Sequence, residues 1–91
     1  MQLRITDMRI GEEGIVLEVQ GGRGLTRKLE LLGIRKGNRI KKLSSQFMRG
    51  PIVLEVTGSQ IAVGFGMANK VIVEVERHQR TEDRRQKTGN R

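Results

Sequence analysis

The chain has 91 residues, of which 18 are lysine or arginine and 10 are aspartate or glutamate, and its formal net charge is +8. This length allows one domain, and the absence of cysteine excludes disulfides, thiolate metal sites and thiol nucleophiles. The N-terminal residues lack the apolar stretch of a signal peptide, and no apolar run is long enough to cross a bilayer, so we expect a soluble cytoplasmic protein.

Alternating apolar residues, separated by glycines, predict a small all-β domain. The first strand is expected at 14–20, where Ile15, Leu17 and Val19 fall on one face. Glycine is abundant, with 12 residues spread along the chain. Those expected to serve turns are Gly11, Gly14, Gly33, Gly37 and Gly58.

The next segment changes to a helical period. Leu25, Leu29 and Leu32 follow the spacing of one helix face, so we expect them to face the core. Gly33 stands where a helix-terminating glycine is usually found. We therefore predict one helix at 24–32, packed across an open end of the sheet.

Four further strands are predicted after this helix. The segment 38–44 is the weakest, because its two apolar residues have an odd spacing that indicates a bulge. The segments 52–56 and 60–63 are separated by turn residues and are expected to pair as a hairpin. The segment 71–76 alternates valines with other residues and completes the set.

The residues that support catalysis are scarce. The only histidine, His78, lies outside the apolar part of the chain, so no serine within 1–76 has a histidine that would activate it. The carboxylates of Asp7, Glu12 and Glu13 are close in sequence, but we expect them to be solvated in a loop. We predict no enzymatic activity, and we identify no catalytic, cofactor or metal site.

Basic charge is concentrated in two stretches, 35–42 and 77–91. The second contains six basic residues, two acidic residues and no apolar residue, so we place the domain at 1–76 and expect a disordered basic tail after it. This charge makes nucleic-acid binding a first alternative function. Against it, Phe47 and Phe65 are the only aromatic residues available to stack on bases.

Five segments of this chain, in this order and spacing, resemble the FeoA family of bacterial ferrous iron uptake. The similarity extends from about residue 3 to residue 76. The segments are MRIGEEGIV (8–16), GLTRKLELLGI (24–34), RKG (35–37), GPIV (50–53) and GSQIAVGFGMANKVIV (58–73).

The resemblance implies an SH3-like β-barrel of about five strands, with the helix at 24–32 inserted after the first long strand. It also implies a small cytoplasmic accessory or regulatory protein that binds FeoB, the membrane GTPase that moves Fe²⁺. The family is linked to transition-metal handling, so direct binding of a transition metal is a second alternative. Arg49 departs from the acidic or small residue that many relatives carry before the Gly-Pro pair.

Five residues have no evident role in folding and are therefore candidates for binding the partner. Arg27 and Lys28 lie outside the apolar face of the predicted helix. Phe65 lies between two glycines, which makes an exposed aromatic or a core position equally consistent with the sequence. Met67 and Lys70 follow it, although Met67 also fits a single helical turn that closes the barrel.

Overall fold

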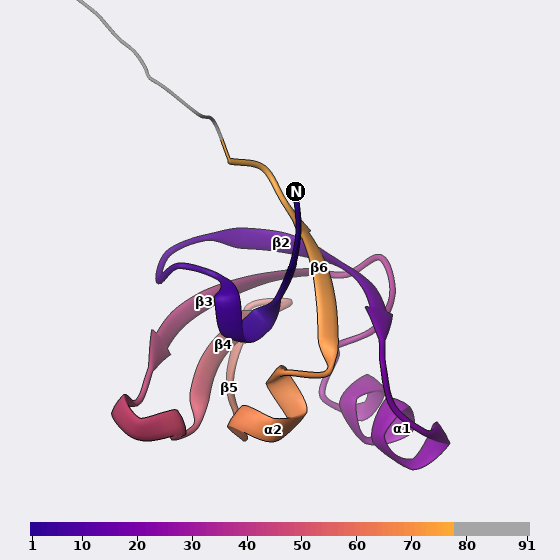
Figure 1. The fold of residues 1–91 in the computed structure, drawn as a ribbon. Helices are drawn as coiled ribbons and strands as arrows, with labels where there is room; N and C mark the ends of the chain where they lie inside the picture. Colours follow the sequence, from indigo (N-terminus) through magenta and orange to yellow (C-terminus); the bar gives the residue numbers. More distant parts are fainter. Residues whose placement is uncertain (78–91) are drawn as a thin grey trace, which may run out of the picture.

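The computed structural model describes residues 1–77 and forms one open antiparallel sheet of six strands, in the order β1-β6-β2-β3-β4-β5. The sheet curls into a barrel, as Figure 1 shows, which confirms the SH3-like class with one strand more than expected. The strands are β1 (Gln2–Arg4), β2 (Glu13–Val19), β3 (Arg39–Ser45), β4 (Ile52–Val56), β5 (Ser59–Val63) and β6 (Val71–Val75).

Four short helical segments connect these strands within residues 1–77. They are the α-helices α1 (Arg23–Leu31) and α2 (Phe65–Ala68) and the 3₁₀ turns η1 (Ile5–Asp7) and η2 (Phe47–Arg49). The single turn α2 crosses one end of the barrel in Figure 1, where Ala68 is fully buried, as the sequence had suggested for this segment. In the described part of the chain, no helix has the length and apolar character needed to cross a membrane.

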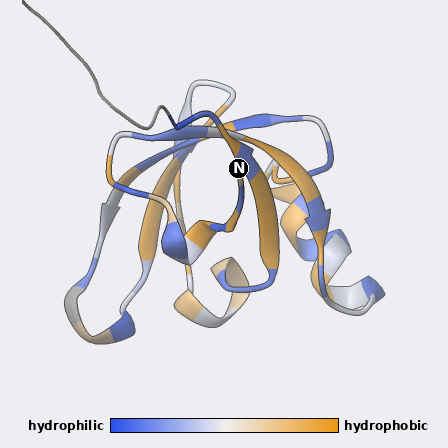
Figure 2. Ribbon diagram, turned by 45° about the horizontal axis from the view of Figure 1, so that its top comes forward, coloured by the Kyte–Doolittle hydropathy of each residue, from blue (hydrophilic) through white to orange (hydrophobic). Residues whose placement is uncertain are grey.

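The core contains apolar side chains from strands β2 to β6, from both α-helices and from η1. In β4 and β6 the buried residues alternate strictly, as the period-two pattern of these strands predicts. In Figure 2 the most hydrophobic stretches lie on the strands that enclose this core. The buried apolar residues are Ile5, Met8, Val16, Leu29, Ile34, Ile40, Ile52, Leu54, Val56, Val63, Ala68, Val71, Val73 and Val75.

Two strands in the middle of the sheet contain a bulge. The register of β2 against β6 shifts between Val16 and Glu18, which leaves Leu17 as the extra residue. The register of β3 against β4 shifts between Lys42 and Ser44, which confirms the bulge predicted for this strand.

The bulge in β2 changes which residues face the core. Before the bulge Val16 is the buried residue, and Ile15 and Leu17 are only half-buried, whereas after the bulge Val19 packs against the core. The expected apolar face is therefore right for Val19 and wrong for Ile15 and Leu17. Gly14 was expected at a turn but is buried inside β2. A Cβ at Gly14 would lie 3.1 Å from the carbonyl oxygen of Glu74 in β6, so the glycine is explained by close strand approach.

The helix α1 ends in the motif that the sequence predicted. Gly33 has φ +92°, its N–H donates to the carbonyl of Glu30 at 2.9 Å, and the N–H of Ile34 donates to the carbonyl of Leu29 at 2.9 Å. Leu29 and Ile34 are fully buried. Leu32, however, is 39% exposed, so its predicted core position is wrong. The turn at Gly33 gives that position to Ile34.

Candidate partner-binding surface

The structure places the five candidate residues at the same end of the barrel. Arg27 and Lys28 are exposed on α1, and Lys70 is exposed directly after α2. Phe65 and Met67 are half-buried on α2 and pack partly against the core. Figures 1 and 2 both show α1 and α2 at this end, so residues about 40 positions apart in the chain face the same side of the molecule.

The 3₁₀ turn η2 extends this surface with two residues that were not among the candidates. The guanidinium carbon of Arg49 lies 5.7 Å from the centre of the Phe65 ring, a cation–π contact. Met48 beside it is 83% exposed. We call the group Met48, Arg49, Phe65, Met67 and Lys70 the α2–η2 surface.

The backbone of η2 is strained in a way that exposes Met48. Met48 has φ 61° and Arg49 has φ 65°, and two successive left-handed residues without glycine are uncommon. Each such residue costs about 1–2 kcal/mol, and strain of this kind concentrates at functional sites. Arg49 could have been suspected from its departure from the resemblance, whereas no sequence pattern indicated the conformation of Met48.

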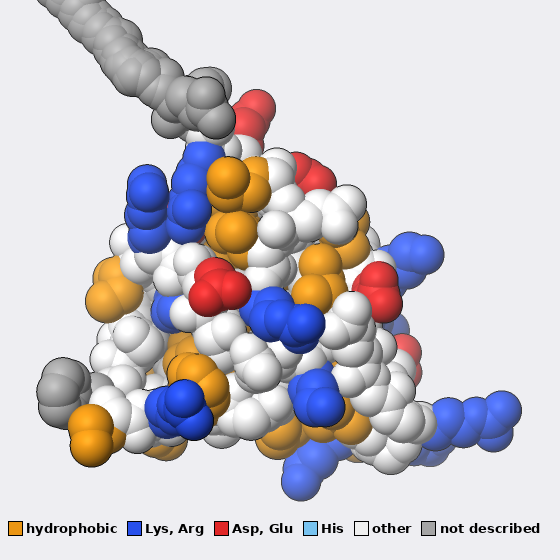
Figure 3. Space-filling model, viewed as in Figure 1, with side chains coloured by type: hydrophobic (Ala, Val, Ile, Leu, Met, Phe, Trp, Pro, Cys, Tyr) orange, Lys and Arg blue, Asp and Glu red, His pale blue; other side chains and the backbone are white. Residues whose placement is uncertain are grey.

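The α2–η2 surface combines apolar and positive character. Arg49 is the only charged residue in the segment 43–54, and Lys70 is the only charged residue in 56–73. Figure 3 shows hydrophobic and basic side chains interspersed along the lower edge of the molecule, the edge formed by η2 and the two helices. Methionine, aromatic residues and arginine are enriched at protein interfaces, so this composition fits a protein partner.

Lys42, part of the basic stretch 35–42, is buried and does not contribute to a nucleic-acid surface. Its side chain is 3% exposed. Burial lowers the pKa of its ammonium from the usual 10.5, and the nearby carboxylates of Asp7 and Glu12 oppose this shift. Its Nζ donates to the carbonyl oxygens of Ile5 at 3.1 Å, Thr6 at 3.3 Å and Met8 at 2.8 Å.

The carboxylate expected to be solvated at position 12 is ion-paired. The Nε and Nη2 of Arg77 donate to the two carboxylate oxygens of Glu12 at 2.6 and 2.9 Å, and the N–H of Arg9 donates to the same group at 2.7 Å. Arg77 thereby holds the pKa of Glu12 below its usual 4.5, while partial burial opposes the shift. Arg77 is thus tied to the domain, whereas the rest of the predicted tail, 78–91 with His78, lies outside the described residues.

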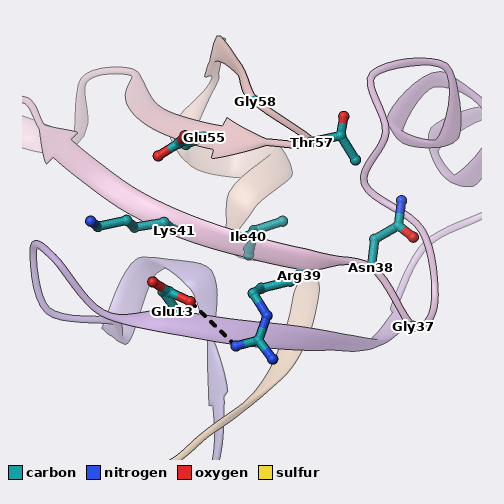
Figure 4. A pocket seen from close by; sticks show the side chains of 9 residues that line it. All are labelled: Glu13, Gly37, Asn38, Arg39, Ile40, Lys41, Glu55, Thr57 and Gly58. Carbon is teal, nitrogen blue, oxygen red and sulfur yellow. Dashed lines mark hydrogen bonds and ion pairs between the residues drawn. The ribbon is translucent and has the colours of Figure 1, made fainter.

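Residues 1–77 contain no cluster of three or more potential metal-ligating side chains. A shallow hollow of about 410 Å³ lies over β2, β3 and β4 and is drawn in Figure 4. Charges of both signs line it, and Arg39 pairs with Glu13 at 3.3 Å. Lys41 lies opposite Glu13 on one side and Glu55 on the other. None of the candidate residues lines this hollow.

Comparison with known proteins decides the family. The model of the FeoA domain matches residues 3–75, almost the entire described chain. The chain belongs to the FeoA family. It is 39% identical over 64 residues to the putative Fe(2+) transport protein A of Methanocaldococcus jannaschii, a match that covers 70% of this chain and 76% of that protein. The family is therefore that of ferrous iron transport protein A.

Solved structures agree with this assignment. The crystal structure of an iron uptake regulatory protein (FeoA) superposes with a TM-score of 0.76 and 33% identity, covering 84% of this chain and 99% of that one. A manganese-dependent transcriptional repressor superposes with a TM-score of 0.75 and 18% identity, but this chain covers 42% of it. The second likeness concerns the fold alone and shows the same barrel as part of a longer chain.

Proposed function

We propose that this FeoA-family protein is a non-enzymatic accessory protein of ferrous iron uptake that acts in the cytoplasm by binding a FeoB-type membrane GTPase. The observation that carries the proposal is the α2–η2 surface, where an exposed methionine, an arginine in cation–π contact with an aromatic ring and an exposed lysine occur together. Arginine is one of the residue types that dominate the binding energy of protein interfaces, and methionine and aromatic residues are enriched in them. Arg27 and Lys28 on α1 extend the positive area at the same end.

Binding of this kind is sufficient to regulate a GTPase. The switch segments of GTPases change between ordered and disordered states, and a small domain with higher affinity for one state shifts the population toward it. No catalytic group on the accessory domain is needed for this effect. The proposal therefore assigns binding roles, and no chemical step, to Arg27, Lys28, Phe65, Met67 and Lys70.

Paired charge reversals on the full chain test the proposal. One variant carries Arg49→Glu and Lys70→Glu, a second carries Arg27→Glu and Lys28→Glu, and both are compared with the parent for binding to the cytoplasmic part of FeoB and for Fe²⁺ uptake in cells. Each reversal of a solvent-exposed charge should change the free energy of unfolding by about 0.5 kcal/mol, with up to about 1 kcal/mol at Arg49 for the lost cation–π contact. Binding should weaken at least tenfold, because the reversal adds repulsion.

Two controls separate docking from folding. Arg35→Glu with Lys36→Glu reverses two exposed charges in the loop after α1 and should leave binding unchanged. Leu29→Ala removes a fully buried side chain and should cost about 2–5 kcal/mol, so it loses uptake through unfolding. If both test pairs fold and bind FeoB as the parent does, this end of the barrel is not the docking surface.

A further inference from the structure

The last strand of the sheet, β5, has an open edge. It pairs only with β4, and the register continues through all five residue pairs without a bulge. Its sequence, Ser-Gln-Ile-Ala-Val, contains no charged residue and no proline, whereas each of the other five described strands carries a charged side chain. Proteins commonly protect edge strands with charges, prolines or bulges, and β5 has none of these.

Backbone groups at two positions of β5 are available for hydrogen bonding. The turn at 57–58 has two residues with φ 46° and 83°, so the flanking residues Val56 and Ser59 form a hydrogen-bonded pair. Because such pairs alternate along an antiparallel ladder, the N–H and C=O groups of Gln60 and Ala62 point to the open edge. Both residues are exposed, and their backbone groups have no partner in the loops and turns of residues 1–77.

The chain around this edge favours an acidic partner. β5 leads directly into α2, so its edge ends at the α2–η2 surface. The segments 43–54 and 56–73 carry Arg49 and Lys70 and contain no carboxylate. The carboxylate between them, Glu55, lies on β4 opposite Gln60, near the start of β5, whereas α2 follows the other end of the strand. A segment with acidic side chains complements the charges of Arg49 and Lys70. A second copy of the chain would bring like charges together, and each copy has a net charge of +8.

We propose that β5 binds an extended acidic segment of a protein partner, which pairs with its open edge as an additional strand. The N–H groups of Gln60 and Ala62 donate to the backbone of the segment, and their carbonyls accept from it. Carboxylates of the segment lie near Arg49 and Lys70. This inference rests on the proposed docking function and adds the conformation and the charge of the segment that docks.

Amide hydrogen exchange on the full chain tests the proposal directly. Exchange is followed by NMR for the protein alone, with the cytoplasmic part of FeoB, and with a short acetylated and amidated peptide of alternating glutamate and valine. We expect exchange at the amides of Gln60 and Ala62 to slow by about tenfold or more on binding, because a hydrogen bond replaces contact with water. Ile61, which is bonded to β4 already, should change less.

Three substitutions at one position provide matched variants. Ala62→Pro removes the N–H that faces the edge without removing a ladder bond, as prolines on edge strands do. Ala62→Glu places a carboxylate beside the acidic segment, and Ala62→Lys places a cation of similar size there. We expect the proline and glutamate variants to weaken binding about tenfold and the lysine variant to maintain or tighten it. If circular dichroism shows that Ala62→Pro does not fold, the proposal is tested by comparing the binding of Ala62→Glu with that of Ala62→Lys.

The outcomes distinguish this inference from the proposed function. If FeoB binds while the two amides stay unprotected and Ala62→Glu binds as the parent does, strand pairing is refuted and docking stands. If FeoB does not bind, the proposed partner is wrong and the peptide decides: slowed exchange at Gln60 and Ala62 supports strand pairing, and unchanged exchange refutes it. Protection that grows with protein concentration, with a dimer mass by light scattering, assigns the edge to a second copy and overturns the proposal.

Discussion

Replacing Lys42 by methionine should destabilise the domain strongly, although lysine is usually a surface residue. The ammonium donates to three carbonyls, and those of Thr6 and Met8 have no other hydrogen-bond donor within residues 1–77. A buried carbonyl without a partner costs about 1–3 kcal/mol, and the variant regains part of this because it buries no charge. We therefore expect a loss of about 2–4 kcal/mol, or a fall of roughly 10–25 °C in the melting temperature of a domain this size.

Thermal and urea unfolding followed by circular dichroism measure this loss. The control is Lys41→Met, since Lys41 is the neighbouring residue, is half-exposed, and should change stability by about 0.5 kcal/mol or less. The pKa of Lys42 is lowered in the fold, so the unfolded chain retains this proton to higher pH. The stability difference between parent and Lys42→Met should therefore grow as the pH rises toward 10.5. Equal stability of the two methionine variants would refute the reasoning.

Four further predictions follow from the same contacts. Gly33→Ala should cost about 1–3 kcal/mol in urea unfolding, because Gly33 has φ +92° and a Cβ there would lie 2.8 Å from Cγ1 of Val56; Gly58→Ala, at φ +83° in open space, should cost less. The fold lowers the pKa of Glu12 from 4.5, so the ionised carboxylate stabilises the parent relative to Glu12→Gln. The difference in unfolding free energy between the two should be largest above pH 4.5 and should shrink as the pH falls below it. Deleting 78–91 should leave the melting temperature within a few degrees and weaken binding to heparin. Calorimetric titration of Fe²⁺ into metal-free protein should show no stoichiometric site of micromolar affinity.

Local sequence patterns were sufficient to predict most of the fold. The strands β4 and β6 were predicted because their β-branched residues alternate with period two, and the end of α1 was predicted because Gly33 permits a left-handed turn. Two of the errors share one physical cause, a change of direction within an element. The bulge at Leu17 reverses the faces of β2, and the turn after Leu31 moves Leu32 out of the core.

The sequence was less informative about individual side chains that depend on distant partners. Lys42 is buried because it donates to carbonyls 34 to 37 residues earlier in the chain, and no local pattern encodes this pairing. Met48 belongs to the α2–η2 surface because of two left-handed residues that only the folded chain shows. Phe65 was selected from its sequence context, but its contact with Arg49 required the three-dimensional structure.

The two ends of the folded domain are adjacent. The amine of Met1 donates to the carbonyl of Val75 at 3.0 Å, and the N–H of Val75 donates to the carbonyl of Met1 at 2.8 Å. Figure 1 shows this point at the end of the barrel opposite α1 and α2. A fluorescent protein or an affinity tag attached after Arg77 would therefore leave the α2–η2 surface accessible. A linker joining residue 77 to residue 1 would be short, which makes the barrel suitable for circular permutation with new termini in the loop at 57–58.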